Sequence, residues 1–592
     1  MKKNKTPKQT VSLKLLAENV RGYIVPSVLA PLFVIAEVVL EVLIPREMGR
    51  LVDDGIALGD MGAVWTHGGI MLAYAFLALV AGALSARFAA VASMGFAKNL
   101  RASLFEKIQS FSFANVDKFS TGSLVTRLTT DVTFIRNAYA MLIRIAFRAP
   151  LMFVMSIAVS VSINYRIAMI FIVVAPIMAA ALVGIGMIAF PLFRQMFKRF
   201  DKMNSAVQEN LIGIRVVKAF VKEDHETEKF RDAAEKVRET QVKAERLLVY
   251  GQPAMQFIMF ACMVAVVLMG GREIINASSP MTIGDLTSFI SYVNQILISL
   301  VMVAMIFVNL VISSASAARA TEVLKEKPSI DDSEAEEGLH VESGSISFKN
   351  VSFAYASNGD KNVLDGLDLD IGSGEVIGII GGTGSAKSTL VQLIPRLYDV
   401  SGGAVEVDGR NVKRYPVKNL RESVAMVLQK NVLFSGTIRD NLKWGDESAT
   451  DEELMNAAAA ANADEFINRF PDGLDTDLGQ GGVNLSGGQK QRLCIARALL
   501  KKPKIMILDD STSAVDTMTD AKIRTALKQF FKDMTVIIIA QRVSSVMDAD
   551  EIVVMDGGKI SAVGTHRKLF ESNEIYREVC ISQHKGVDDE NA

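Results

Sequence analysis

The stretch EVIGIIGGTGSAKSTLVQLI (375–394) combines a short apolar run, a glycine-rich loop and the start of an apolar helix. The predicted strand is VIGII (376–380), and GGTGSAKST (381–389) follows it directly. Strand, loop and helix in this order form a phosphate-binding loop, because the backbone N–H groups of the loop converge on a phosphate at the helix N-terminus. The stretch therefore predicts an α/β nucleotide-binding domain.

Within this loop, Lys387 is expected to reach the β- and γ-phosphates and Ser388 to bind Mg²⁺. The loop departs from the pattern G-x-x-x-x-G-K-[ST] at one position, because Ala386 stands where the pattern has glycine. We expect the methyl group to crowd the loop slightly and nucleotide binding to survive. The predicted nucleotide contacts in the loop are Gly382, Thr383, Gly384, Ser385, Ala386, Lys387, Ser388 and Thr389.

Two further motifs belong to the same domain. IMILDDSTSAVD (505–516) begins with four apolar residues that predict a buried strand, and Asp509 at its end is predicted to hold Mg²⁺ directly or through water. LSGGQKQR (485–492) lies between this strand and the phosphate loop. With that motif in place, residues 345–580 resemble the nucleotide-binding domain of an ATP-binding cassette (ABC) transporter. The whole chain resembles an ABC exporter half-transporter.

This resemblance implies ATP and Mg²⁺ as cofactors and roles for further residues. Tyr355 in VSFAY corresponds to the aromatic residue that stacks on adenine, and Gln429 to the glutamine that senses Mg²⁺ and the membrane domain. Asp516 in SAVD (513–516) is expected to cross a dimer interface. Gln480 in TDLGQGG (476–482) stands where exporters have glutamate, and short coupling helices are expected near 112–120 and 209–217.

Two catalytic positions depart from the family pattern. Asp510 replaces the glutamate that acts on the attacking water, and its carboxylate is set back by roughly 1 Å, a displacement that can cost about 100-fold in rate. Gln541 replaces the histidine that contacts the γ-phosphate, and an amide cannot carry the charge of an imidazolium. The predicted catalytic set is Asp510, Gln541, Gln429, Ser486 and Gly488.

The signature LSGGQ is intact, and this makes the expected pairing asymmetric. In the family, each ATP lies between the phosphate loop of one chain and the signature of the other. The resemblance therefore implies a second, different half-transporter with a competent Walker site, as in bacterial heterodimeric multidrug-type exporters. The signature residues that would contact the partner's ATP are Ser486, Gly487, Gly488 and Gln489.

Two other functions remain open. One is a homodimeric exporter of lipid or peptide that tolerates Asp510 and Gln541. The other is a regulatory or channel-like ABC protein in which ATP only gates. Such proteins usually carry extra regulatory segments, whereas this chain has a short acidic linker, DDSEAEEG (331–338), which is typical of solvated sequence. The sequence does not name the substrate, and the family analogy points to amphipathic compounds.

The first half of the chain has a different character from the second. Residues 1–320 contain 33 Lys and Arg against 22 Asp and Glu, whereas residues 321–592 contain 31 against 43. A basic, apolar half joined to an acidic, mixed half predicts a membrane domain fused to a cytosolic one. We expect a lipid bilayer as a partner of the first half and no nucleic acid.

Six apolar stretches are long enough to cross a bilayer, which needs about 20 residues. The long polar stretches 94–137 and 191–246 are expected to continue the helices out of the membrane. The predicted fold is a six-helix membrane domain with long cytoplasmic extensions, fused to an α/β P-loop domain with a helical subdomain. The six spans are predicted near 24–44, 68–93, 138–161, 166–190, 247–270 and 287–312.

The distribution of charge predicts the orientation. Residues 51–86 contain no Lys or Arg, whereas 191–246 contain 13, so the first stretch is expected outside and the second inside. The nucleotide-binding domain and both termini are then cytoplasmic, in the cytoplasmic membrane of a bacterium. The expected domains are 1–322 (membrane), 323–342 (linker) and 343–592 (nucleotide-binding). We read no signal peptide at the N-terminus, and 12–23 is expected to form an amphipathic helix at the inner interface.

Several charged residues fall at membrane depth. Glu37 and Glu41 are expected to share one helix face, and Arg144 and Arg148 another. They either line a polar cavity or form Glu–Arg pairs between helices. Met255, Met259, Met263 and Met269 either form an adaptable substrate surface or fill a packed interface. The three cysteines are too far apart for a metal site and are expected to be ordinary buried thiols.

Overall fold

The computed structural model describes residues 11–276, 281–355, 361–510, 519, 522–523, 525–526 and 533–584. The chain divides into two compact units. The first, here called the membrane unit, comprises Met1–Gln109 and Gly122–Lys325; the second, the nucleotide unit, comprises Ser110–Thr121 and Glu326–Ala592. The predicted domain limits at 322 and 343 remain predictions. An unexpected feature of this division is that residues 110–121 belong to the nucleotide unit.

The membrane unit consists of helices. They are α1 (Leu13–Ala17), α2 (Ile24–Arg50), α3 (Met61–Gln109), α5 (Thr121–Thr126), α6 (Val132–Ile143), α7 (Ile145–Ile163), α8 (Tyr165–Ile212), α9 (Ile214–Ala219), α10 (Glu223–Ile275) and α11 (Ile283–Lys325). Residues Glu18–Val20 form a 3₁₀ turn. Leu51–Ile56 and Arg127–Asp131 each form a π-helical turn. Within the part of the chain that the structure describes, six stretches are long and apolar enough to cross a membrane: Ile24–Ile56, Met61–Gln109, Thr121–Ile163, Tyr165–Ile212, Glu223–Ile275 and Ile283–Lys325. Each contains one predicted span, which confirms the six-helix architecture.

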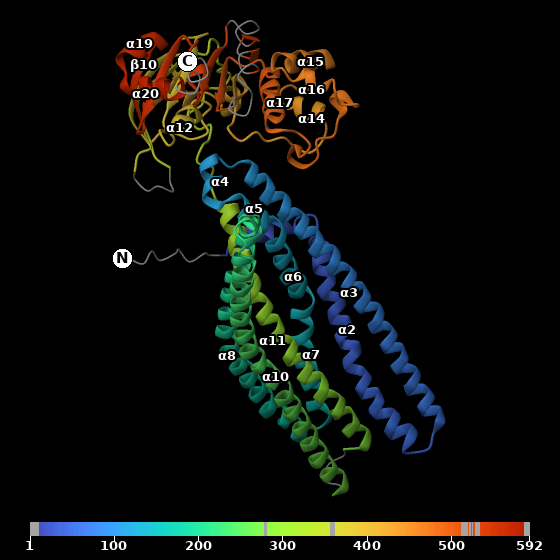
Figure 1. The fold of residues 1–592 in the computed structure, drawn as a ribbon. Helices are drawn as coiled ribbons and strands as arrows, with labels where there is room; N and C mark the ends of the chain where they lie inside the picture. Colours follow the sequence, from blue (N-terminus) through green and yellow to red (C-terminus); the bar gives the residue numbers. More distant parts are fainter. Residues whose placement is uncertain are drawn as a thin grey trace. The chain divides into compact units, whose positions relative to one another are not determined.

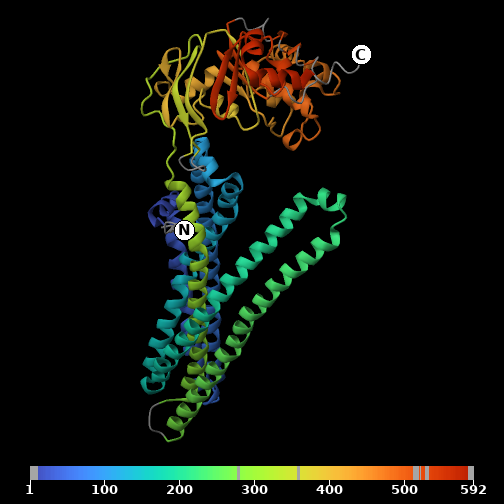
Figure 2. The same cartoon turned by 60° about the vertical axis from the view of Figure 1, so that its left-hand side comes forward.

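Helices α8 and α10 form a long hairpin whose tip is α9. Figure 2 shows this hairpin, in green, diverging from the rest of the membrane unit toward its tip. The prediction of a short helix at 209–217 is wrong in its bounds, because α8 continues to Ile212 and α9 begins only after Gly213. Gly213 interrupts the helix (φ −88°, ψ 11°), as expected for the residue with the lowest helix propensity after proline.

Three of the four charged residues predicted at membrane depth form ion pairs between helices. Arg148 on α7 bonds Glu37 on α2, and its Nη2 donates to both carboxylate oxygens of Glu41 at 2.8 Å. The prediction that Arg144 and Arg148 share one continuous helix is wrong. Arg144 is non-helical (φ −121°, ψ −68°) and separates α6 from α7. Pro150 weakens this region, because it lacks an N–H and crowds the preceding turn.

Of the four methionines whose role was left open, two lie in packed positions, whereas Met269 is exposed. Met255 and Met259 pack against a core cluster formed by α8, α10 and α11, which supports the interface interpretation for these two. The segment after Ser12 forms only α1 and a 3₁₀ turn before α2 begins. Along the chain, Cys262, Cys494 and Cys580 are all buried free thiols.

The nucleotide unit contains two sheets and surrounding helices (Figure 1). One sheet has the order β2-β1-β4-β5 and is antiparallel, and the other has the order β10-β9-β3-β8-β7-β6. In the second sheet β10 pairs antiparallel with β9, and the other neighbours are parallel. The strands are β1 (Ile346–Phe353), β2 (Leu364–Ile371), β3 (Val376–Gly381), β4 (Gly402–Val407), β5 (Arg410–Asn411), β6 (Val424–Val427), β7 (Ile505–Asp509), β8 (Thr535–Ile539), β9 (Glu551–Asp556) and β10 (Lys559–Gly564).

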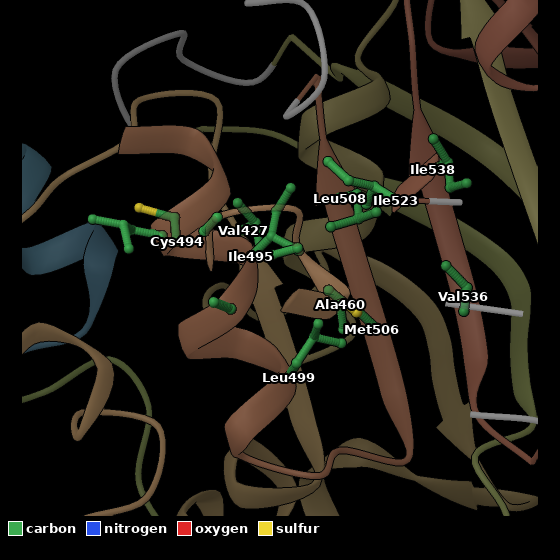
Figure 3. Close-up of a cluster of buried hydrophobic side chains, with 14 of the residues drawn as sticks. Val427, Ala460, Cys494, Ile495, Leu499, Met506, Leu508, Ile523, Val536 and Ile538 are labelled. Carbon is green, nitrogen blue, oxygen red and sulfur yellow. The ribbon is translucent and has the colours of Figure 1, made fainter. Parts of the chain in front are cut away.

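The helices of this unit surround the sheets. They are α4 (Phe113–Phe119), α12 (Lys387–Gln392), α13 (Val417–Ser423), α14 (Ile438–Leu442), α15 (Asp451–Ala460), α16 (Asp464–Ile467), α17 (Gly487–Leu500), α19 (His566–Ser572) and α20 (Glu574–His584). All five residues of β7 are buried, as predicted for the strand that ends in Asp509. In Figure 3, Ile495 and Leu499 of α17 lie with Met506 and Leu508 of β7 in one apolar cluster. This packing anchors the helix that follows the signature.

Candidate nucleotide-binding site

The phosphate loop connects β3 to α12, as predicted. β3 is parallel to both β8 and β9, so the loop leaves the carboxyl edge of the central sheet. Gly382, Thr383 and Gly384 are exposed, whereas Ser385 and Thr389 are buried. The exposed part of the loop is thus available to a ligand, and its two ends are fixed in the core.

Ala386 occupies the last loop position in a left-handed conformation (φ 69°, ψ 22°). For an L-residue with a side chain, this conformation costs roughly 1–2 kcal/mol, and glycine avoids the cost. The methyl group packs against the core cluster around β3. The cost at this position is therefore strain in the backbone and not the predicted crowding of the loop by the methyl group.

Lys387 folds over the loop that precedes it. Its Nζ donates to Gly381 O at 2.9 Å, to Gly382 O at 2.8 Å and to Ser385 Oγ at 3.2 Å. Burial lowers the pKa of Lys387, and the nearby carboxylates of Asp509 and Asp510 oppose this shift. The ammonium group is therefore centred on the phosphate loop, where three oxygens surround it.

Ser388 and Asp509 meet at the carboxyl edge of the sheet. The Ser388 hydroxyl donates to Asp509 Oδ1 at 2.8 Å, and Asp509 is 3% exposed. Burial raises the pKa of Asp509 above its usual value. Two hard oxygen ligands side by side, one of them a carboxylate, are the donor type that Mg²⁺ prefers. The predicted metal residues Ser388 and Asp509 thus fit the ion.

Asp510 is the point where three predicted residues converge. Gln541 Nε2 donates to Asp510 Oδ2 at 2.9 Å, and Gln429 Nε2 donates to the same oxygen at 3.3 Å. The backbone of Asp510 is left-handed (φ 47°), and its N–H bonds Ile539 O at 3.0 Å. The residue therefore turns sharply out of β7 while remaining tied to β8, and two amide groups hold its carboxylate.

Tyr355 lies next to the phosphate loop. Its hydroxyl is 3.1 Å from Thr389 Oγ1, and its ring makes edge contacts with Phe353 and Tyr398. The structure therefore brings together Tyr355, Lys387, Ser388, Thr389, Gln429, Asp509, Asp510 and Gln541 on one side of the nucleotide unit.

The signature lies elsewhere in the same unit. Ser486 caps α17: its Oγ accepts from Gln489 N at 3.3 Å, and its N–H donates to Gln489 Oε1 at 2.9 Å. Ser486 and Gly487 are exposed, and Gly488 is half-buried. Across the described residues, no hydrogen bond joins this segment to the phosphate loop, and Figure 1 shows α17 apart from α12. Within one chain, the predicted site residues thus form two separate groups.

One predicted residue, Gln480, lies outside these groups, and another falls in a segment that the structure does not describe. Gln480 is exposed in a short 3₁₀ turn before the signature. Asp516 and the rest of SAVD lie outside the described residues. The sequence reasoning missed Tyr398, whose hydroxyl donates to Asp117 Oδ2 on α4 at 2.7 Å. A single sequence carries no signal for this contact, because the two residues are 281 positions apart.

Comparisons with known proteins agree with this geometry. Residues 27–317 match the ABC transporter transmembrane region, and residues 364–513 match the ABC transporter family. An uncharacterized ABC transporter ATP-binding protein, YfiB from Bacillus subtilis, is 38% identical over 94% of this chain and 96% of its own length. An ATP-dependent lipid A-core flippase from Desulfotalea psychrophila is 33% identical over 81% of this chain and 83% of its own length.

A solved structure has the same architecture. It is described as a bacterial Atm1-family ABC exporter with ATP bound, and it is 25% identical with a TM-score of 0.80. The match covers 96% of this chain and 99% of that protein. Six membrane-crossing helices, a phosphate loop on a parallel sheet and a signature helix are fused here in one polypeptide, which therefore belongs to the ABC transporter family as an exporter half-transporter.

Proposed function

We propose that this chain is the degenerate-site subunit of a heterodimeric exporter that removes amphipathic compounds of the multidrug type across a bacterial cytoplasmic membrane. Residues 1–322 would form its membrane domain, 323–342 a linker and 343–592 a cytoplasmic nucleotide-binding domain, with both termini cytoplasmic. The observation that carries the proposal is the bonding of Gln541 and Gln429 to one oxygen of Asp510.

This bonding opposes general base catalysis by Asp510. The carboxylate is one methylene shorter than that of glutamate, and two amide donors engage one of its two oxygens. A base must come within hydrogen-bond reach of the proton that it takes, and a displacement of about 1 Å can lower the rate about 100-fold. Gln541 adds no positive charge at the γ-phosphate. We therefore expect this site to hydrolyse ATP slowly.

The same site retains the residues that would hold MgATP. Ser388 and Asp509 supply paired oxygens for Mg²⁺, with Gln429 as the third predicted metal residue. Lys387 would meet the phosphates, and Tyr355 would stack on adenine. When bound, Mg²⁺ would neutralise phosphate charge, and these residues would position the triphosphate. Slow turnover with retained binding is the expected result.

The signature segment supports a role toward a different partner. Ser486 and Gly487 are exposed at the N-terminus of the 14-residue helix α17, where free backbone N–H groups favour an anion. This chain would thus complete the competent site of a second half-transporter. Two copies of this chain would instead form two slow sites.

A homodimeric lipid exporter is the alternative. Two relatives with 33% and 32% identity are named ATP-dependent lipid A-core flippases, which favours a lipid substrate. The purified chain alone separates the two proposals, because a homodimer would hydrolyse ATP vigorously without any partner.

The direct test replaces the catalytic carboxylates one at a time in the two-chain complex. We expect Asp510→Ala in this chain to leave most of the ATPase activity and Glu→Gln in the partner's Walker site to remove it. Equal losses from the two substitutions would refute the asymmetry. Activity is measured as phosphate release in nanodiscs, with Lys387→Ala reporting the contribution of nucleotide bound at this chain's own site.

A further inference from the structure

Helix α4 is attached to the nucleotide unit by its own side chains. Asn115, which is 4% exposed, accepts from Ser329 N at 3.0 Å and donates to Lys327 O at 3.0 Å. Lys118 pairs with Glu326 at 2.7 Å. Along the chain, α4 lies between α3 and α5, so it is covalently connected to two helices of the membrane unit.

The same helix reaches the aromatic residue of the nucleotide site through one intermediate. The ring of Tyr398 lies edge-on to that of Tyr355 (5.3 Å, 89°), and its hydroxyl donates to Asp117 Oδ2 at 2.7 Å. Phe113 of α4 contacts the Tyr398 ring at 6.0 Å. Burial raises the pKa of Tyr398, so its hydroxyl stays protonated and remains a donor. Tyr398 therefore touches both the site and the helix.

We propose that Tyr398 and Asp117 are positioning residues through which α4 responds to the nucleobase, separately from the phosphates. The proposal rests on the predicted stacking of adenine on Tyr355. A base that stacks on Tyr355 restricts the tilt of its ring. Since Tyr398 packs perpendicular to that ring, a change in tilt displaces Tyr398. The bond to Asp117 then moves α4.

The contact between Tyr355 and Tyr398 involves other residues than those that meet the phosphates. Lys387, Ser388 and Asp509 respond to the triphosphate, and their hydrogen bonds involve the phosphate loop and β7. Tyr355 also bonds Thr389, so its hydroxyl is linked to the helix of the phosphate loop. Because Tyr398 packs against the Tyr355 ring and not against this hydroxyl contact, a ligand with phosphates and no base should act on the loop while moving α4 less than ATP does.

The experiment uses the full chain in nanodiscs with a fluorophore at Gly122→Cys. A side chain at position 122 meets no atom within 4 Å, and the three native cysteines are buried. Mg²⁺ with ATP and Mg²⁺ with inorganic tripolyphosphate are compared at saturation. The wild-type chain is expected to respond more strongly to ATP. Tyr398→Phe and Asp117→Asn should lose this ATP-specific part while ATP affinity stays within about twofold, since the ring packing at Tyr355 is preserved.

A matched control is Tyr415→Phe. Tyr415 is a buried tyrosine of the same unit whose hydroxyl bonds Val407 O, away from α4. Removal of the Tyr415 hydroxyl should preserve the ATP-specific response. The proposal is overturned if wild type responds equally to ATP and tripolyphosphate, if Tyr398→Phe keeps the difference, or if Tyr415→Phe loses it too.

Failure of this proposal is distinct from failure of the proposed function. The fluorescence change requires binding and no turnover, so brisk ATP hydrolysis by the chain alone would refute the degenerate site and leave this comparison valid. If Tyr355→Ala binds ATP with unchanged affinity, adenine does not stack on Tyr355, and the base-dependent route is overturned.

Discussion

Gln541 donates its side-chain amide to Oδ2 of Asp510 at 2.9 Å. The resemblance drawn from the sequence predicts that these residues stand at the histidine and glutamate positions of the family, and in the structure they bond each other. Two separate substitutions thus form one local arrangement. Restoring either residue alone would leave an unsuitable partner, because a lone glutamate faces an amide and a lone histidine faces the shorter carboxylate.

The first prediction concerns this pair. In the isolated chain, Asp510→Glu together with Gln541→His should raise ATP hydrolysis by about 100-fold, the factor expected from moving a base by about 1 Å into reach. Each single substitution should give much less than the pair, since residues in contact are not additive. Phosphate release from the purified chain measures the effect.

The control for this gain is the double variant with Lys387→Ala, which should abolish it. A double variant that hydrolyses ATP no faster than wild type would show that the two positions do not limit the site.

Much of this arrangement could be predicted from the sequence, and the reasons are physical. Apolar length alone predicts the six spans, and the order of strand, loop and helix predicts the phosphate loop. The left-handed backbone of Asp510 could not be predicted, because the pairing of its N–H with Ile539 O depends on the neighbouring strand. The bond between Tyr398 and Asp117 likewise depends on tertiary packing. Arg144 was misplaced because helix periodicity does not locate a break.

A second prediction follows from the buried Asp509 carboxylate. Burial raises its pKa in the folded state, so the folded chain binds this proton more tightly than the unfolded chain does. Stability should therefore fall as the pH rises from about 3.8, the ordinary value, through the raised folded pKa. Asp509→Asn removes this penalty, and at neutral pH without nucleotide it should unfold at a higher temperature than wild type.

Added MgATP should reverse the order of the two unfolding temperatures, because only wild type gains binding energy. This gain is about 2.7 kcal/mol at a ligand concentration of 100 times the dissociation constant. Thermal unfolding scans in detergent across pH measure both effects. A variant that is less stable than wild type at neutral pH without nucleotide would contradict the account.

The third prediction concerns the strained Ala386. In Ala386→Gly, relief of about 1–2 kcal/mol of left-handed strain is opposed by the flexibility of glycine, about 0.5–1 kcal/mol, and by loss of a part-buried methyl group, up to about 0.8 kcal/mol. The net change in unfolding free energy should be within about 1 kcal/mol. Ala386→Val should instead destabilise by about 2 kcal/mol or more, because a β-branched residue tolerates this backbone poorly.

The comparison variant is Ala404→Val on β4, a half-buried strand position where valine is favoured. Chemical unfolding of the full chain gives the three values. Similar losses for valine at 386 and 404 would mean that the left-handed backbone is not what limits position 386.

The last prediction tests the contact between α2 and α11. Gly284 lies in the first turn of α11 against Gly49, and its N–H donates to Asp53 Oδ1 at 2.8 Å. Farther along, Ser288 Oγ bonds Pro45 O at 2.7 Å and Tyr292 bonds Val42 O at 2.8 Å. A Cβ at position 284 would lie 2.0 Å from Gly49 O. Gly49 O is a backbone atom, and the other close group is the Asp53 carboxylate, which Thr282 and Gly284 N–H hold in place, so a methyl group at 284 would push the two helices apart.

Gly284→Ala should therefore lower the unfolding free energy by about 3 kcal/mol, at the upper end of the range for overpacked cores. Gly271→Ala on α10 is the matched control, since a Cβ there meets nothing within 4 Å. That substitution should be neutral or stabilise by up to about 1 kcal/mol through helix propensity. If the two alanine variants unfold alike in detergent, α2 and α11 are not held together by this close approach.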